Sequence, residues 1–171
     1  MKKINIFLIL LSFLTVPYVN LAQSKKKADQ ETAEWRYEIE AAGTGTQGNY
    51  QVKVWTYSKN PETAIEQAKK NSVHGIIFKG FPDKDRIKGQ KALAQNPNLE
   101  QEKEDFFKPF FQDGGKYQKF VSLVNNGAIG PGDRLKIGKE YKIGVVVSVN
   151  VAALRKDLED AGIIKGLSSG F

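Results

Sequence analysis

The sequence predicts an α+β fold: an antiparallel sheet of about five strands with two main helices packed on one face. Apolar and polar residues alternate on both sides of a glycine-rich segment, and two segments with helical spacing carry start and stop signals. The elements follow the order strand, strand, helix, strand, a poorly defined helical segment, strand, strand, helix. The chain has 171 residues, few enough for a single compact domain, which we place at residues 35–171.

Residues 1–22 have the layout of a secretory signal peptide. Lys2 and Lys3 give a positive start, residues 6–16 form an apolar run, and Ala22 ends a possible cleavage site. The apolar run is short for a membrane span, which needs about 20 residues. We therefore expect a protein that is periplasmic or secreted after cleavage, with no transmembrane span in the mature chain. An uncleaved N-terminal membrane anchor is the alternative.

Composition excludes several kinds of site. The chain has no cysteine, which excludes a lipid-modified cysteine, disulfides, thiol catalysis and zinc–thiolate sites. The formal net charge of +7 falls by two, to +5, if Lys2 and Lys3 leave with the signal peptide. The basic surplus is mostly lysine and there is no arginine-rich segment, so no nucleic-acid partner is expected.

The first elements of the domain predict a hairpin. Residues 23–34 are a flexible polar lead-in without large apolar side chains. Residues 35–41 and 49–57 then alternate between apolar and polar side chains, which is typical of half-buried strands.

Between these strands, three glycines spell a G-x-G-x-x-G motif: Gly43, Gly45 and Gly48. In a dinucleotide-binding fold this motif leads from a strand into a helix whose first amides hold the pyrophosphate. Here the motif leads into a strand, so we interpret it as a hairpin loop and expect no cofactor. Glycine-rich hairpin tips often contact partners, which makes the three glycines candidate partner-contact residues.

A helix begins at Pro61, with Asn60 as its cap and Glu62 in its first turn. The helix is expected to end where the apolar run 75–81 begins, and this run predicts a strand. The only histidine, His74, lies near the helix end. With no cysteine and no second histidine as a fellow ligand, we assign it a structural role and expect no metal.

The next segment, residues 82–98, predicts a polar surface excursion with at most one helical turn at 88–94. Four acidic residues follow at the start of a helical segment: Glu100, Glu102, Glu104 and Asp105. A calcium loop would need a glycine bend among alternating oxygen ligands, which is missing here. We interpret the acidic run as a solvated helical face.

An aromatic cluster comes directly after the acidic run: Phe106, Phe107, Phe110 and Phe111. In a helix the i,i+4 pairs occupy adjacent flanks of one broad stripe, and Pro109 would disrupt a continuing helix. We therefore predict that one pair anchors the core and the other marks a partner surface beside the acidic run. A wholly buried cluster is the alternative.

The last third of the chain predicts a strand at 114–125, a turn-rich loop at 125–140 and a valine-rich strand at 141–150. Asn150 then caps a helix that Gly162 ends.

The hairpin with its small-residue helix and the stretch "YKIGVVVSVNVAALRKDLEDAGI" resemble the small envelope domains of certain bacterial outer-membrane lipoproteins. They also resemble the N-terminal domain of a periplasmic flagellar-assembly protein. The resemblance covers residues 35–80 and 141–162, whereas the long middle, 82–135, and the missing lipid-anchor cysteine depart from it. The leader, which ends in "LAQ", is similar to those of exported proteins from Bacteroidetes-type bacteria. These resemblances imply an assembly or binding role in the cell envelope and supply no catalytic residue.

The inventory of nucleophile motifs is poor. No G-x-S-x-G is present, and the nearby serine, Ser72, lies only two positions from His74, on another face of the helix. We therefore expect an exported, non-enzymatic cell-envelope binding or assembly protein, whose partner is another envelope protein or an envelope surface. The alternatives are a secreted effector or surface protein acting on another cell, and a small secreted enzyme whose carboxylates meet only in space.

Overall fold

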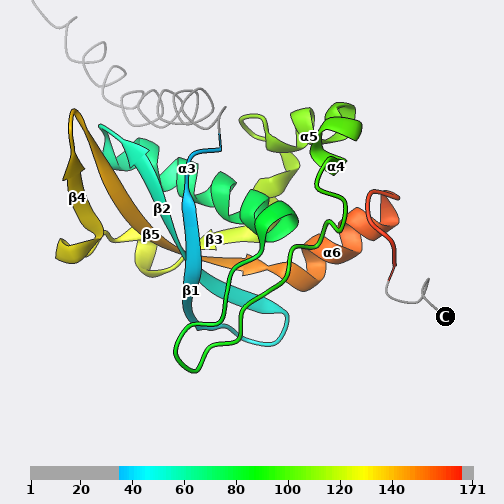
Figure 1. The fold of residues 1–171 in the computed structure, drawn as a ribbon, viewed down its shortest axis with the longest axis horizontal. Coiled ribbons are helices and arrows are strands. Elements are labelled where there is room, and N and C mark those ends of the chain that lie inside the picture. Colours follow the sequence, from blue (N-terminus) through cyan, green and yellow to red (C-terminus); the bar gives the residue numbers. More distant parts are fainter. Residues whose placement is uncertain (1–34, 167–171) are drawn as a thin grey trace, which may run out of the picture.

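The computed structural model describes residues 35–166, so the predicted signal peptide (1–22) and lead-in (23–34) lie outside the described part of the chain. Five strands form one antiparallel sheet, curved like half of a barrel (Figure 1). The strands are β1 (Glu38–Thr44), β2 (Asn49–Ser58), β3 (Val121–Leu123), β4 (Arg134–Ile137) and β5 (Glu140–Asn150). The predicted fold class, a single α+β domain, is confirmed.

Strand β5 is the centre of the sheet. One of its edges pairs with β2 along ten residues, from Tyr141 opposite Ser58 to Asn150 opposite Asn49. Its other edge pairs first with β4 and then with β3. Alternate valines of β5 are fully buried because they point to the same face of the sheet, toward the core.

Helix α3 (Pro61–His74) packs on this core face, against β2, β5 and β3 (Figure 1). The predicted cap is present: the Asn60 side chain accepts a hydrogen bond from the Glu62 amide at 2.9 Å. Ala64 and Ala68 have no exposed surface, so the helix lies close to the strands.

The predicted C-terminal helix is also present as α6 (Val151–Asp160), which follows β5 directly. The Asn150 side chain accepts a hydrogen bond from the Ala153 amide at 2.9 Å. Leu154 and Leu158 are fully buried, and Gly162 takes the left-handed conformation just beyond the helix.

Residues 75–81 do not form the predicted strand. The chain continues from α3 into a π-helical segment, η1 (Gly75–Lys79), whose residues Ile76 and Ile77 are fully buried. Their carbonyls accept hydrogen bonds from the amides of Leu93 (3.1 Å) and Ala94 (2.8 Å). The prediction was wrong because a short apolar run fills a core equally well as a strand or as a buried helix.

Two further segments differ from the prediction. Residues 116–120 form a 3₁₀-helix, η2 (Lys116–Phe120), ahead of the short β3. The segment predicted as a loop at 125–140 contains β4, together with two short 3₁₀-helices, η3 (Asn125–Gly127) and η4 (Pro131–Asp133).

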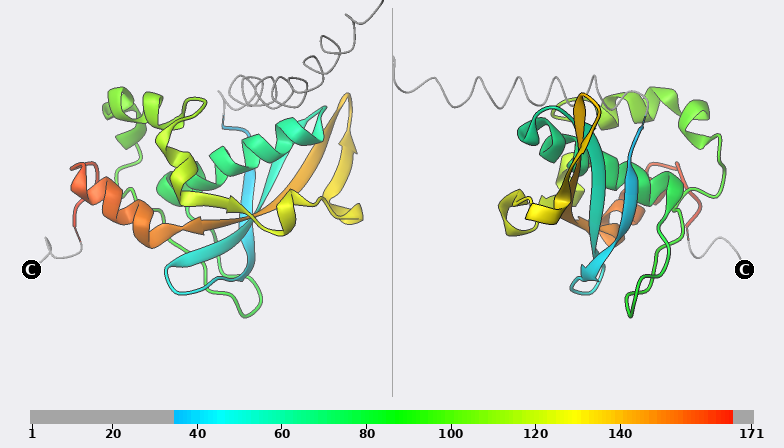
Figure 2. Two further views of the ribbon diagram at one scale, coloured as in Figure 1. Left: turned by 180° about the vertical axis from the view of Figure 1, so that it is seen from behind. Right: turned by 60° about the vertical axis from the view of Figure 1, so that its left-hand side comes forward.

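Residues 88–94 form no helical turn. They belong in part to a narrow ribbon, residues 81–90, in which Phe81 pairs with Gln90 and Lys84 with Ile87. We call this ribbon the arm. Helices α4 (Leu99–Glu102) and α5 (Glu104–Phe111) follow it, and the views of Figures 1 and 2 place them on the opposite side of the domain from the arm.

Candidate functional site

The sheet has a second face, which points away from α3. In β2 the buried residues alternate with half-buried ones because successive side chains point to opposite faces. The registers of β1 and β5 continue this pattern across the sheet. We call this surface the Trp55 face. Its residues, most of them partly accessible, are Glu38, Glu40, Gln51, Lys53, Trp55, Tyr57, Lys142, Gly144, Val146 and Ser148.

Trp55 covers Gly144, its register partner on β5. A Cβ atom on Gly144 would lie 3.0 to 3.2 Å from three carbons of the indole ring. Because Gly144 has no side chain, the indole ring has room to lie over it. The ring in turn covers the backbone of Gly144, which would otherwise be exposed. This pairing fixes the orientation of the indole on the sheet.

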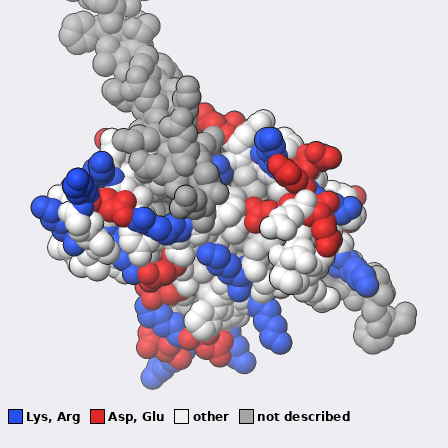
Figure 3. Space-filling view, turned by 45° about the horizontal axis from the view of Figure 1, so that its top comes forward, with Lys and Arg blue, Asp and Glu red and all other residues white. Residues whose placement is uncertain are grey.

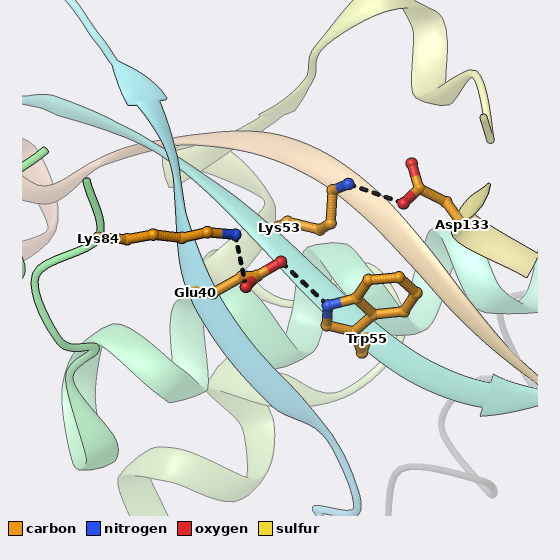
Figure 4. A network of polar contacts seen from close by, with 5 residues as sticks. All are labelled: Glu40, Lys53, Trp55, Lys84 and Asp133. Carbon is orange, nitrogen blue, oxygen red and sulfur yellow. Dashed lines mark hydrogen bonds and ion pairs between the residues drawn. The ribbon is translucent and has the colours of Figure 1, made fainter. Parts of the chain in front are cut away.

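Polar contacts from three other segments surround the indole (Figure 4). Trp55 Nε1 donates to Glu40 Oε1 at 3.2 Å, and Lys84 of the arm reaches Glu40 Oε2 at 2.8 Å. Lys53 Nζ donates to Asp133 Oδ1 at 2.7 Å. Burial opposes ionisation of the Glu40 carboxyl, but its hydrogen bonds to Lys84 and Trp55 outweigh that cost and lower its pKa.

The next row of side chains is also paired. Lys142 Nζ lies 2.6 Å from Glu38 Oε1, which also accepts a hydrogen bond from the Tyr57 hydroxyl at 3.3 Å. The Arg36 guanidinium lies 4.0 Å from the centre of the Tyr57 ring and bonds to Glu140. The hydrogen bond to Glu38 raises the pKa of Lys142.

The charges of the two rows are held in ion pairs. Each acidic side chain of the two rows is bonded to a lysine or arginine. What the surface offers is an oriented indole, a phenol ring and a set of fixed charges.

The phenylalanine cluster is mostly core. Phe107, Phe110 and Phe111 are 2 %, 3 % and 4 % exposed. Only Phe106 is half-buried, and it stacks on Phe110 with 5.6 Å between ring centres. The predicted division into a core pair and a partner-facing pair is therefore wrong. Helix α5 continues past Pro109, so three rings reach the interior, where they meet side chains of η1 and η2.

The glycine motif belongs to the hairpin of β1 and β2: Gly43 lies in β1 opposite Gln51, and Gly45 and Gly48 lie in the turn between the two strands. Gly48 has a positive φ of 82°, whereas a Cβ on Gly45 would lie 2.5 Å from the Asn49 carbonyl oxygen. The Gly48 carbonyl accepts a hydrogen bond from the Ala152 amide at 3.1 Å, which ties the loop to the first turn of α6. Contact of Gly43, Gly45 and Gly48 with a partner stays a prediction.

His74 takes part in a buried contact that sequence reasoning missed. Its Nδ1 lies 2.6 Å from the Tyr37 hydroxyl and its Nε2 lies 3.1 Å from Glu100 Oε2. An ionised carboxylate only accepts, so Nε2 carries the proton and Tyr37 donates to Nδ1. We call these three residues the His74 relay. The relay joins the segment just before β1 to α3 and α4, and no sequence motif connects positions 37, 74 and 100.

Burial shifts the pKa of two members of the His74 relay. Burial is the main cause that raises the pKa of Tyr37, and the nearby charge of Glu100 raises it further. The Tyr37 hydroxyl therefore stays neutral. Burial also lowers the pKa of His74, outweighing the opposite effect of Glu100. Trp35 stacks on the imidazole with 3.6 Å between ring centres. These contacts indicate a structural role for His74 in holding α4 against α3.

Two kinds of feature are absent from residues 35–166. Nowhere in that range do three His, Cys, Asp or Glu side chains come together as a possible metal site. The same range contains no helix with the length and apolar character of a membrane span.

Comparison of the chain with protein-family models, curated proteins and solved structures finds no match.

The Trp55 face could be anticipated only in part. The alternation in residues 51–57 predicts that Trp55 and Tyr57 share a face with Lys53. That Gly144 lies under the indole, and that Lys84 reaches Glu40, depends on register and on the path of the arm.

Proposed function

We propose that this protein is an exported, non-enzymatic binding or assembly protein of the cell envelope, and that it holds its partner on the Trp55 face. The partner is another envelope protein or an envelope surface. The leader motif of residues 1–22 supports export.

One observation carries the proposal: a partly accessible tryptophan is held in one orientation on the sheet face that points away from α3. Tryptophan is among the residues that most often dominate the energy of protein interfaces. An indole already fixed by Gly144 and Glu40 loses little conformational freedom when a partner covers it, and that favours affinity.

Site-specific photocrosslinking in cells that produce the protein tests this proposal. A photoreactive amino acid is placed at Gln51 or Ser148, which face each other on the Trp55 face, and as a control at Lys156 on the exposed side of α6. We expect a discrete crosslinked product from positions 51 and 148 and none from position 156. Trp55→Ala should remove the product, with a thermal melt as the check on folding.

Equal products from all three positions, or none from positions 51 and 148, would contradict a binding role for this face. Cell fractionation with the same samples checks the compartment, and a cytoplasmic location would contradict the envelope role.

A further inference from the structure

Strand β4 is the most exposed element of the sheet. Leu135 and Ile137 are 48 % and 44 % exposed, and they are the exposed large hydrophobic residues of the described part of the chain. Both lie on this one four-residue strand, at positions i and i+2. Two apolar side chains are thus left partly uncovered on the same face of one strand, which makes this face a candidate contact surface.

The opposite face of β4 is basic. Arg134 and Lys136 alternate with the two apolar residues, and Lys139 stands in the turn that joins β4 to β5. All three are exposed, and none makes an ion pair within residues 35–166. Arg134 instead lies over the Tyr141 ring, 4.2 Å from its centre. The space-filling view shows lysine and arginine gathered at this end of the molecule, whereas acidic side chains gather toward α4 and α5 (Figure 3).

One edge of β4 is also unpaired. The strand pairs with β5 on one side, and no other strand within residues 35–166 pairs with it. A free strand edge presents backbone donors and acceptors that a further strand can use. Basic side chains on such an edge disfavour self-pairing and favour a strand of opposite charge.

We propose that the free edge of β4 binds an extended segment of a partner protein in which acidic and apolar residues alternate. The segment adds as a further antiparallel strand beside β4. Its apolar side chains cover Leu135 and Ile137 on one face, and its carboxylates meet Arg134 and Lys136 on the other. This site adjoins the Trp55 face but uses the backbone edge of the sheet, and it does not depend on Trp55.

The pattern of side chains favours a strand over a membrane surface. A hairpin that inserts into lipid would carry its apolar side chains at the tip, where this hairpin has Gly138 and Lys139. Here the apolar residues lie on one face of the strand and the basic residues on the other. A neighbouring strand with the same alternation of two residue types can contact both sets of side chains.

The test uses the purified full-length protein and synthetic peptides of about seven residues, a usual strand length. One capped peptide alternates Glu and Val, a second alternates Lys and Val, and a third is the Glu–Val peptide N-methylated on alternate amides. We expect the Glu–Val peptide alone to bind, with amide chemical-shift changes centred on Arg134–Ile137. N-methylation should abolish binding because it removes backbone donors and leaves the charges unchanged.

Charge reversal provides the matched comparison. Arg134→Glu with Lys136→Glu should weaken binding of the Glu–Val peptide by at least about tenfold and should create binding of the Lys–Val peptide. Lys88→Glu with Lys91→Glu makes the same change of charge at two other exposed lysines and should leave both affinities unchanged.

Three outcomes would overturn the proposal. The N-methylated peptide could bind as tightly as its parent, which would mean that charge attraction alone accounts for the binding. The Lys88 and Lys91 control could weaken binding as much as the β4 variant. The protein could bind phosphatidylglycerol vesicles through the hairpin while ignoring every peptide, which would make the hairpin a membrane contact.

Discussion

At the scale of single residues, the contact between Trp55 and Gly144 determines the shape of the Trp55 face. A side chain at position 144 would press on the indole, since the site of its Cβ lies 3.0 Å from the nearest ring carbon. The indole cannot move away without breaking its hydrogen bond to Glu40. The glycine is thus required by its neighbour, because its own φ lies outside the left-handed range.

We therefore expect Gly144→Ala to lower the free energy of unfolding by about 1–3 kcal/mol through overpacking. The control is Gly132→Ala, because a Cβ there meets no atom within 4 Å. Urea unfolding measures both variants. A Gly144→Ala protein as stable as the Gly132→Ala protein would mean that the indole does not rest on this glycine.

At the scale of elements, helix α5 is attached to the domain by aromatic rings. Phe107 contacts Phe78 of η1 with 5.0 Å between ring centres, and Phe110 stacks on Phe120 of η2 at 6.2 Å. Phe106 lies at the outer end of this stack.

The two neighbouring rings should thus respond differently to truncation. Phe107→Ala should cost about 3–5 kcal/mol of unfolding free energy, the usual effect of emptying a core aromatic site. Phe106→Ala should cost no more than about 1–2 kcal/mol, because part of that ring is already in water. Thermal melts of the two variants check the order, and equal losses would contradict the exposure of Phe106.

The contact between α3 and α4 should depend on pH. Burial lowers the pKa of His74 in the folded protein below its ordinary value of 6.5, so the unfolded chain takes up the proton first as pH falls. The contribution of His74 to the free energy of unfolding is complete above about pH 6.5. This contribution is lost as pH falls below that value, by up to about 1.4 kcal/mol per pH unit.

Urea unfolding between about pH 8 and pH 5 measures this slope. His74 is the only histidine in the chain, so His74→Gln should flatten the curve over the range where only histidine titrates. A slope that survives the substitution would assign the pH dependence to other groups.

At the scale of the whole molecule, local patterns predicted the sheet class and the two long helices, because caps and alternation mark Asn60, Asn150 and β2 within a few residues of sequence. The strand predicted at residues 75–81 is wrong because a segment buried on every side shows no alternation of apolar and polar residues that would distinguish a strand from a helix. Strand β4 was missed because four residues with two charges do not stand out inside a turn-rich segment. The His74 relay joins positions far apart in the chain, and only the packing of α4 brings them together.

Export stays a prediction at the scale of the whole molecule. We expect the mature protein to begin at Gln23 or within a residue or two of it, because the layout of residues 1–22 places a cleavage site after Ala22. Intact-mass measurement of protein from native envelopes checks this. A mass that includes Met1 would support the N-terminal anchor instead.

The arm has a consequence for engineering the chain. Its two ends are hydrogen-bonded to each other, from Phe81 N to Gln90 O and from Gln90 N to Phe81 O, at 2.9 and 3.0 Å. These hydrogen bonds hold the base of the arm together, so an insertion at the tip lengthens a loop that is already closed. Lengthening a closed loop adds only a slowly growing entropic cost. A tag or a small reporter domain inserted between Asp85 and Arg86, both exposed, should leave the sheet and the β4 edge unchanged. The tip of the arm is thus a natural point of attachment for purification, imaging or immobilisation.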